Sequence, residues 1–265
     1  MNNTKLDNIY IALMALAKKK SCNLIMILSL ANCSPDIDEM SLYERALHHK
    51  SRYSADRSED NYHKPFQLLD FIELSSGDRV VDLMGGGGYF TELFSYIVGD
   101  DGVVYIHNNK HFLHYFESEI TKRLSGERLS NVIRLDNEFS KMELPDNIDI
   151  IFIGQGYHNI YVPRDNPDEM VSRDDFLAQL YRSLKLGGKV IIIENAAQPG
   201  TGIKDTHRLH RIDEVRVKDD MTKAGFQYMG AMTDFRNQDD NYNLDIWHKT
   251  VFKKTDRFVH KYIKQ

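Results

Sequence analysis

Between residues 65 and 264, short apolar runs alternate with segments whose apolar residues recur every three to four positions. Short runs of β-branched and apolar residues are typical of buried strands, and the longer period is typical of amphipathic helices. Strands that alternate with helices predict an α/β fold with a mostly parallel sheet. The predicted strands are Arg79–Met84, Val103–Asn108, Asn131–Leu135, Ile148–Gln155, Lys189–Asn195, Phe226–Phe235 and Asp256–Lys264, and the predicted helices are Pro65–Ile72, Tyr89–Val98, His111–Leu124, Arg173–Leu184 and Ile212–Ala224.

The segment before this alternation, residues 34–64, is polar and charged. Apolar positions at Leu42, Tyr43, Ala46 and Leu47 predict one helix, and an irregular stretch rich in Asp, Arg and Ser follows. We therefore expect three parts: a targeting segment over residues 1–33, a helical extension over residues 34–64, and an α/β domain over residues 65–265.

The first residues have the pattern of a targeting signal. A lysine block (residues 18–20) precedes a short apolar core, Cys22–Ala31, which is too short to span a bilayer comfortably. The sequence Leu-Ala-Asn-Cys that ends at Cys33 resembles a bacterial lipoprotein signal, and Met14 could serve as an internal start. This pattern predicts export and a lipid anchor on Cys33 at the cell envelope. The alternative is a helix added to the fold of a cytoplasmic protein.

Composition narrows the choice of partners. The chain has 265 residues, 42% of them hydrophobic, and a net charge of −5, which argues against a general nucleic-acid binder. Both cysteines lie in the apparent signal, so we expect neither a structural disulfide nor a cysteine metal site. The histidines lack carboxylate or cysteine partners at ligand spacing, and we predict no bound metal.

The glycine run Gly85–Gly88 is the most informative motif. It follows a predicted strand that contains Asp82 and precedes a predicted helix. Glycines allow the backbone to approach a ligand, and the free N–H groups of a helix N-terminus bind polar ligands. The dinucleotide pattern G-x-G-x-x-G fits worse, because its third glycine falls on Phe90 or Thr91. The alternative is a tight strand-to-helix turn without a ligand.

This run resembles the first motif of class I S-adenosylmethionine-dependent methyltransferases, D-x-G-x-G-x-G. Asp82, Gly86 and Gly88 match, whereas Met84 replaces the first glycine. The sequences Leu184–Lys189 and Ala224–Phe226 resemble the turns before the fifth and sixth strands of this class, so the resemblance covers Pro65–Lys264. It implies a Rossmann-like, doubly wound, seven-stranded sheet, S-adenosylmethionine as cofactor, and crowding of that ligand by Met84.

The resemblance also implies which residues bind the cofactor. Ligands of such sheets bind beyond the carboxyl ends of the strands. The residues expected there are Asp82 for the amino end of the ligand, Met84, Gly86 and Gly88 in the turn, Asn108 for the ribose, Asp136, Asn137 or Glu138 for the adenine amine, and Gln155 after the fourth strand. The alternatives are a turn-capping role for Asp82 and solvated turns for Asn108, Asp136 and Glu138.

Three residues are candidates for catalysis. Tyr157 and His158 follow the fourth strand, where the class places groups that face the transferred methyl, and either could take a proton from an acceptor. His210 lies in the charged run His207–Glu214. That run could recognise a charged substrate or form an interlocked network of salt bridges and caps.

Further short motifs resemble an uncharacterised bacterial family of predicted methyltransferases that often carry export signals. They are P-G-T-G at Pro199–Gly202, H-R-I-D-E at His210–Glu214, D-R-F-V at Asp256–Val259, and Asp56-Arg57 with Asp60. The leading hypothesis is methyl transfer from S-adenosylmethionine to a small molecule, with no nucleic-acid partner. The alternative is a non-catalytic binding or accessory protein of the same fold, tethered to the membrane through Cys33.

Overall fold

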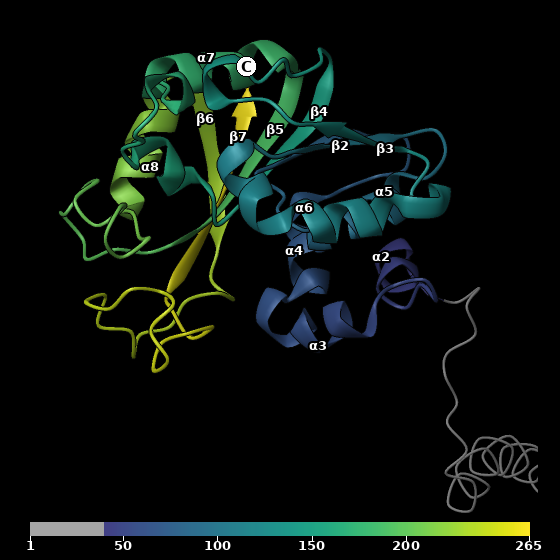
Figure 1. The fold of residues 1–265 in the computed structure, drawn as a ribbon, viewed down its shortest axis with the longest axis horizontal. Coiled ribbons are helices and arrows are strands. Elements are labelled where there is room, and N and C mark those ends of the chain that lie inside the picture. Colours follow the sequence, from purple (N-terminus) through teal and green to yellow (C-terminus); the bar gives the residue numbers. More distant parts are fainter. Residues whose placement is uncertain (1–39) are drawn as a thin grey trace, which may run out of the picture. The chain divides into compact units, whose positions relative to one another are not determined.

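A seven-stranded sheet forms the centre of the structure, a computed structural model that describes residues 40–265. The strand order is β3-β2-β1-β4-β5-β7-β6, with β7 antiparallel to both its neighbours and the other pairs parallel (Figure 1). This arrangement confirms the predicted doubly wound α/β fold. The strands are β1 (Arg79–Leu83), β2 (Val103–His107), β3 (Val132–Leu135), β4 (Ile148–Gly154), β5 (Leu184–Asn195), β6 (Phe226–Met232) and β7 (Arg257–Lys264).

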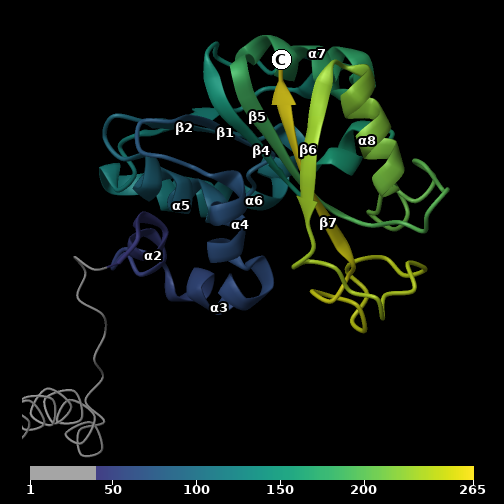
Figure 2. The ribbon, with the colours of Figure 1, turned by 180° about the vertical axis from the view of Figure 1, so that it is seen from behind.

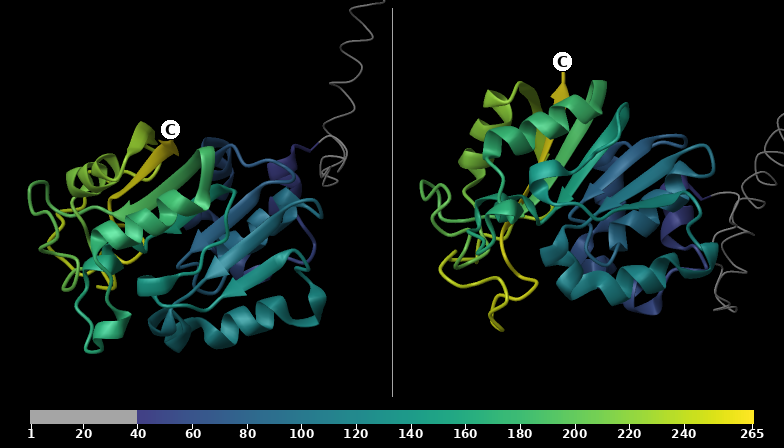
Figure 3. Two further views of the ribbon diagram at one scale, coloured as in Figure 1. Left: turned by 90° about the horizontal axis from the view of Figure 1, so that it is seen from above. Right: turned by 45° about the horizontal axis from the view of Figure 1, so that its top comes forward.

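Helices cover both faces of the sheet, as Figures 2 and 3 show. Apolar side chains of α7 and α8 pack with those of β4 and β5 in one core, and those of α2, α4 and α5 pack in a second core on the opposite face. The alternating burial of strand residues between two helical layers is what stabilises such a sheet. The helices are α2 (Leu42–Leu47), α3 (Ser54–His63), α4 (Pro65–Ile72), α5 (Tyr89–Val98), α6 (Lys110–Leu124), α7 (Arg173–Ser183) and α8 (Glu214–Lys223).

Local sequence signals explain where several helices begin. Pro65 occupies the first turn of α4, where its missing N–H costs nothing. The side chain of Asn109 accepts a hydrogen bond from Phe112 N at the start of α6, and Ser172 and Asp213 cap α7 and α8 in the same way. Helix α5 has the predicted bounds because Gly88, with φ of 83°, ends the turn before it.

Several predicted bounds differ from the structure, most of all at α3, at the start of β5 and at the end of β6, which ends at Met232 instead of Phe235. Residues 54–63 form helix α3, where an irregular stretch was expected. This helix has few apolar side chains, and ion pairs such as Arg52–Asp60 at 2.7 Å hold it in place, so hydrophobic periodicity could not reveal it. Strand β5 begins at Leu184 instead of Lys189, because Leu184 pairs with Ile148 before an irregularity in the ladder. Helix α7 therefore ends one residue earlier than predicted.

The predicted targeting segment, residues 1–33, lies outside the described residues. Export, lipidation of Cys33 and the three-part division of the chain therefore stay predictions. Within residues 40–265, no helix combines the length and the apolar character that crossing a membrane requires.

Candidate functional site

The loop between β1 and α5 has the backbone geometry that the glycine motif requires. Met84, Gly86 and Gly88 have φ values of 59°, 56° and 83°, in the left-handed region that glycine adopts without strain. Met84 is therefore a strained exception at the first motif position. Its side chain is buried in the core and packs against Gly156, where a Cβ atom would lie 2.9 Å from the Met84 sulfur. This places the loop after β1 directly beside the loop after β4.

The side chain of Arg123 connects the glycine loop to helices α6, α3 and α5. Arg123 of α6 is fully buried, and its Nε donates a hydrogen bond to the carbonyl of Gly87. The Arg123 guanidinium also pairs with Asp56 of α3 at 2.6 Å and with Glu92 of α5. The loop is thereby connected to α3. Asp56, one of the motif residues before the α/β domain, thus has its partner Arg123 67 residues away along the chain.

Asp82 is bonded to the first turn of α5. Its Oδ2 accepts a hydrogen bond from the hydroxyl of Thr91 at 2.5 Å, and the side chain is buried. Burial raises the pKa of Asp82 to about 6, although the hydrogen bonds from Thr91 act in the opposite direction. The contact ties the end of β1 to the first turn of α5.

Asn108 is also bonded to the glycine loop. Its Oδ1 accepts from Gly86 N at 2.9 Å, and its Nδ2 donates to Gly86 O at 3.0 Å. Strand β2 ends one residue earlier than predicted, at His107. His107 is fully buried, and its Nε2 lies 2.8 Å from the carbonyl of Asn137. Burial lowers the pKa of His107 to about 4, so the ring is neutral and donates from Nε2. Its Nδ1 is then an acceptor.

Three buried polar atoms near the ends of β2 and β3 have no hydrogen-bond partner among residues 40–265. They are Nδ1 of His107, Nδ2 of Asn109 and Oε2 of Glu138. Unsatisfied buried groups are rare and costly, so they indicate a place where a polar ligand binds. Asp136, by contrast, is exposed and forms an ion pair with Arg134 at 2.7 Å.

His158 forms a buried pair with Glu194 at the ends of β4 and β5. Its Nδ1 lies 3.1 Å from Glu194 Oε2, and its backbone N–H donates to the same oxygen at 3.1 Å. His158 Nε2 lies 3.3 Å from Nδ2 of Asn159. The ring of His210 stands edge-on, 5.5 Å from the ring of His158. Burial lowers the pKa of His210, and the nearby His158 contributes to the shift.

Tyr157 and Gln155 have different surroundings. The Tyr157 ring lies in the core, and its hydroxyl donates to Asp220 at 3.2 Å, so the structure does not bring it to His158. Burial raises the pKa of Tyr157 well above its usual value. Gln155 Oε1 accepts from the hydroxyl of Tyr62 at 2.9 Å and from Asn195 Nδ2 at 3.3 Å. Tyr62 thus brings α3 to the strand ends.

The charged run His207–Glu214 forms an interlocked network. Arg211 is fully buried, pairs with Asp240 at 2.7 Å and donates to the carbonyl of Ala196. Asp213 caps α8 and also accepts hydrogen bonds from the glycines of P-G-T-G. These residues thus form a network of ion pairs and caps. Within this run, His210 is the residue whose ring faces His158.

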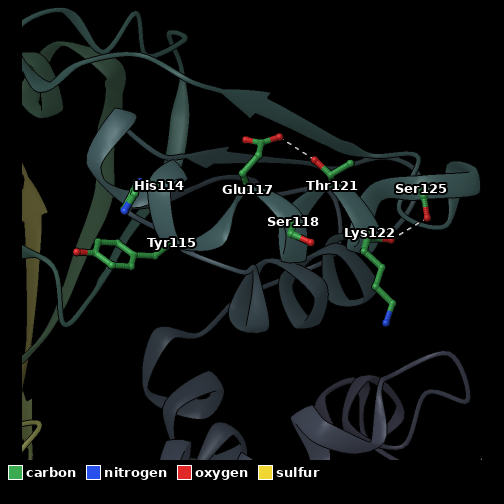
Figure 4. A pocket seen from close by; sticks show the side chains of 7 residues that line it. All are labelled: His114, Tyr115, Glu117, Ser118, Thr121, Lys122 and Ser125. Carbon is green, nitrogen blue, oxygen red and sulfur yellow. Dashed lines mark hydrogen bonds between the residues drawn. The ribbon is translucent and has the colours of Figure 1, made fainter.

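Two other features do not add to this site. A hollow of about 650 Å³ on α6 is lined by the side chains drawn in Figure 4, none of which follows a strand. Thr121 donates a hydrogen bond to Glu117, and Ser125 donates one to the carbonyl of Lys122 (Figure 4). Glu117 also pairs with Arg134 of β3 at 2.8 Å. In the part of the chain that the structure describes, no three His, Cys, Asp or Glu side chains group as metal ligands.

Known structures resemble this fold. An S-adenosylmethionine-dependent methyltransferase from Aquifex aeolicus matches with a TM-score of 0.55 and 22% identity over 78% of this chain and 93% of its own. Phosphoethanolamine N-methyltransferase 2 from Haemonchus contortus, solved with S-adenosyl-L-methionine, matches with a TM-score of 0.54 and 14% identity over 85% of this chain and 60% of its own. At these identities the likeness shows the fold.

Sequence comparison identifies the family. The ubiquinone/menaquinone biosynthesis C-methyltransferase UbiE of Erwinia tasmaniensis is 29% identical over 160 residues, 57% of this chain and 58% of its own. UbiE of Methylococcus capsulatus is 32% identical over 128 residues, 48% of this chain and 46% of its own. The chain thus spans about half the length of these curated relatives. The model of the protein-L-isoaspartate(D-aspartate) O-methyltransferase family matches residues 52–216, well over half of the chain. The chain therefore belongs to this family of class I S-adenosylmethionine-dependent methyltransferases.

Proposed function

We propose that this protein transfers a methyl group from S-adenosylmethionine to a small-molecule acceptor at the ends of β1, β2 and β4. The observation that carries the proposal is the pair of His158 and Glu194, which lies beside the glycine loop. Gly156, two residues before His158, packs against Met84 of that loop. A candidate proton acceptor and a candidate cofactor loop are therefore neighbours.

The unpartnered atoms at the ends of β2 and β3 fit the polar groups of the cofactor. His107 Nδ1 can accept a hydrogen bond from a ribose hydroxyl, the role that an acid has in the class. Asn109 Nδ2 can donate and Glu138 Oε2 can accept, which suits the hydroxyls and the adenine amine. Asp82 and Asn108 then shape the glycine loop through Thr91 and Gly86, instead of binding the cofactor as predicted.

His158 has the geometry of a general base. When its Nδ1–H donates to the Glu194 carboxylate, Nε2 carries the free electron pair. Bound S-adenosylmethionine supplies an electrophilic methyl group on a positively charged sulfur. An acceptor hydroxyl that displaced Asn159 Nδ2 from His158 Nε2 would give its proton to that nitrogen while its oxygen took the methyl group. The S–CH3 bond would break, and S-adenosylhomocysteine would leave. The buried Glu194 stabilises the imidazolium that forms.

The sequence relatives support a small acceptor. Those named as ubiquinone/menaquinone biosynthesis C-methyltransferases act, by that name, in the synthesis of a small molecule. The net charge of −5 also disfavours a nucleic-acid substrate. The family name, by contrast, describes methylation of a protein aspartyl group, so an isoaspartyl peptide belongs among the acceptors to be tested.

Calorimetric titration of the full chain with S-adenosylmethionine tests the cofactor part of the proposal. We expect binding that His107→Phe weakens, because the ring Nδ1 acceptor is lost. An acceptor screen that follows S-adenosylhomocysteine formation tests the catalytic part. His158→Asn should retain cofactor binding and lower the rate about 10²–10⁴-fold. His114→Asn, on the exposed face of α6, is the matched control. Absence of cofactor binding by the folded wild type would overturn the proposal.

A second candidate is a non-catalytic binding protein on the same fold. It is favoured by Asp82 and Asn108, two expected cofactor ligands whose side chains are bonded within the protein. This candidate would be supported if the protein bound the cofactor but formed no product with any acceptor in the screen, and if His158→Asn bound the cofactor as the wild type does.

The proposed lipid anchor on Cys33 is tested separately. Cys33→Ser should release the protein from the membrane fraction or leave an unprocessed precursor.

A further inference from the structure

Arg257, the arginine of the D-R-F-V motif, is buried without a carboxylate partner among the described residues. Only 5% of its surface is exposed. Its guanidinium lies 4.0 Å from the ring centre of Tyr62 and 4.6 Å from that of Phe235. Nη2 donates to the carbonyl of Tyr62 at 2.9 Å, whereas Nε is buried and has no partner. Burial lowers the pKa of Arg257, and the neighbouring Tyr62 acts in the opposite direction.

This side chain lines a cavity of about 250 Å³ between α3, the segment after β6 and the segment before β7. Pockets for complete drug-sized ligands have volumes of about 300–1,000 Å³, so this cavity suits a small group or one end of a larger molecule. The lining residues are Asn61, Tyr62, Lys64, Asp234, Phe235, Arg236, Asn237, Lys253, Lys254, Thr255 and Arg257.

The lining is strongly cationic. Five of these side chains are lysine or arginine, and one is acidic. Arg236 is neutralised by Glu214 and Asp256, and Lys253 by Glu59 at 2.5 Å. Lys64, Lys254 and Arg257 form no ion pair with any residue from 40 to 265, so they outnumber the one lining acid, Asp234. A cavity with this excess of donors and positive charge attracts an oxyanion.

The D-R-F-V motif explains how the cavity is built. Asp256 accepts hydrogen bonds from Asn237 N at 2.7 Å and from the Tyr242 hydroxyl at 3.1 Å, and so fixes the segments on both sides of the cavity. Phe258 and Val259 anchor β7 in the two cores. The remaining residue, Arg257, projects between the two aromatic rings instead of forming an ion pair.

We propose that this cavity binds a phosphate group, held by Arg257 and Lys254. A guanidinium presents several N–H groups in one plane and matches phosphate oxygens, and a lysine adds a point charge. The proposal goes beyond methyl transfer and does not depend on it. The cavity lies at the same edge of the sheet as His158, because Tyr62 bonds to Gln155 and Thr255 bonds to Asn195 at 2.7 Å.

Titration calorimetry of the full chain at constant ionic strength tests the proposal, with inorganic phosphate and phenyl phosphate as probes and acetate as a reference. Equal affinity for both phosphates would indicate a free anion as the ligand. Tighter binding of phenyl phosphate would indicate the phosphate of an organic molecule, whose ring contacts Tyr62 or Phe235. Phosphate binding no stronger than acetate binding would overturn the proposal.

Variants locate the binding. Lys254→Gln removes an unpaired exposed lysine and should weaken phosphate binding about threefold to tenfold. Arg257→Lys keeps the charge but loses the planar donors, and should weaken binding more than Lys254→Gln does. Lys249→Gln, in the same segment but outside the cavity, is the charge-matched control and should change little. Because Lys254 is exposed, its variant should fold normally, and unchanged phosphate affinity in that variant would overturn the assignment.

Discussion

Arg123 and Arg257 are both buried arginines whose guanidinium groups lie over a tyrosine ring, yet their surroundings differ. Arg123 has two short carboxylate partners, Asp56 and Glu92, and a backbone carbonyl. Arg257 has one carbonyl partner and two aromatic rings. A buried charge is costly unless it is paired, so a buried cation without a carboxylate partner is a candidate for binding an anion. The comparison separates a cation that organises the protein from one that is free to bind a ligand.

The largest expected effect is on stability. Arg123→Met leaves the buried Asp56 without its cation, while Glu92 keeps Arg128 at 2.6 Å, and should lower the free energy of unfolding by about 3–5 kcal/mol. Arg257→Met leaves no carboxylate behind and keeps an apolar chain between two rings, so we expect a change of about 1 kcal/mol or less, in either direction. Urea unfolding of both variants in phosphate-free buffer measures the difference. Equal losses would show that the two arginines have the same structural role.

An intermediate effect is expected for Asp56→Asn. Arg123 keeps Glu92, but it loses the bidentate contact with α3, which should cost about 1–3 kcal/mol. The Gly87 carbonyl is then less firmly held, and we expect weaker S-adenosylmethionine binding as well. Thermal unfolding and cofactor titration measure both effects. Asp70→Asn, on the exposed side of α4, is the control, and a cofactor affinity equal to that of the wild type would contradict the link between α3 and the loop.

The smallest effect is a shift in the titration of His63, a neighbour of Arg257. Burial lowers the pKa of His63 to about 4, and the Arg257 charge adds to the shift. A histidine whose pKa is lowered on folding costs stability as pH falls from about 6.5 towards 4, because the unfolded chain binds the proton first. Arg257→Met should raise the pKa of His63 and reduce this loss.

Nuclear magnetic resonance titration of the ring protons of His63 measures its pKa. Arg123→Met should leave it unchanged, since the Arg123 charge is compensated and does not contribute to the shift. A pKa of His63 that stays the same in Arg257→Met would mean that the Arg257 charge is already neutralised in solution, for instance by a bound anion.

The sequence predicted the alternating strands and helices well, because buried parallel strands and amphipathic helices have distinct periods. It did not predict α3, whose polar residues are ordered by partners far along the chain. His158 was a candidate because it follows a strand. The sequence did not indicate Glu194 or Tyr62, because their partners His158 and Gln155 lie 36 and 93 residues away along the chain. Strand β2 ends at His107, one residue earlier than predicted, and for this reason our proposal gives the ribose contact to His107 instead of Asn108.

The contact between Met84 and Gly156 makes these two positions epistatic. In the wild-type background Gly156→Ala would place a methyl group 2.9 Å from the Met84 sulfur and should be poorly tolerated. Met84→Gly removes the clash and relieves a left-handed backbone, so the second change becomes acceptable once the first is present. Gly156 after β4 thus makes room for the methionine that replaces the motif glycine after β1, and Gly156→Ala should be tolerated better after Met84→Gly than before it.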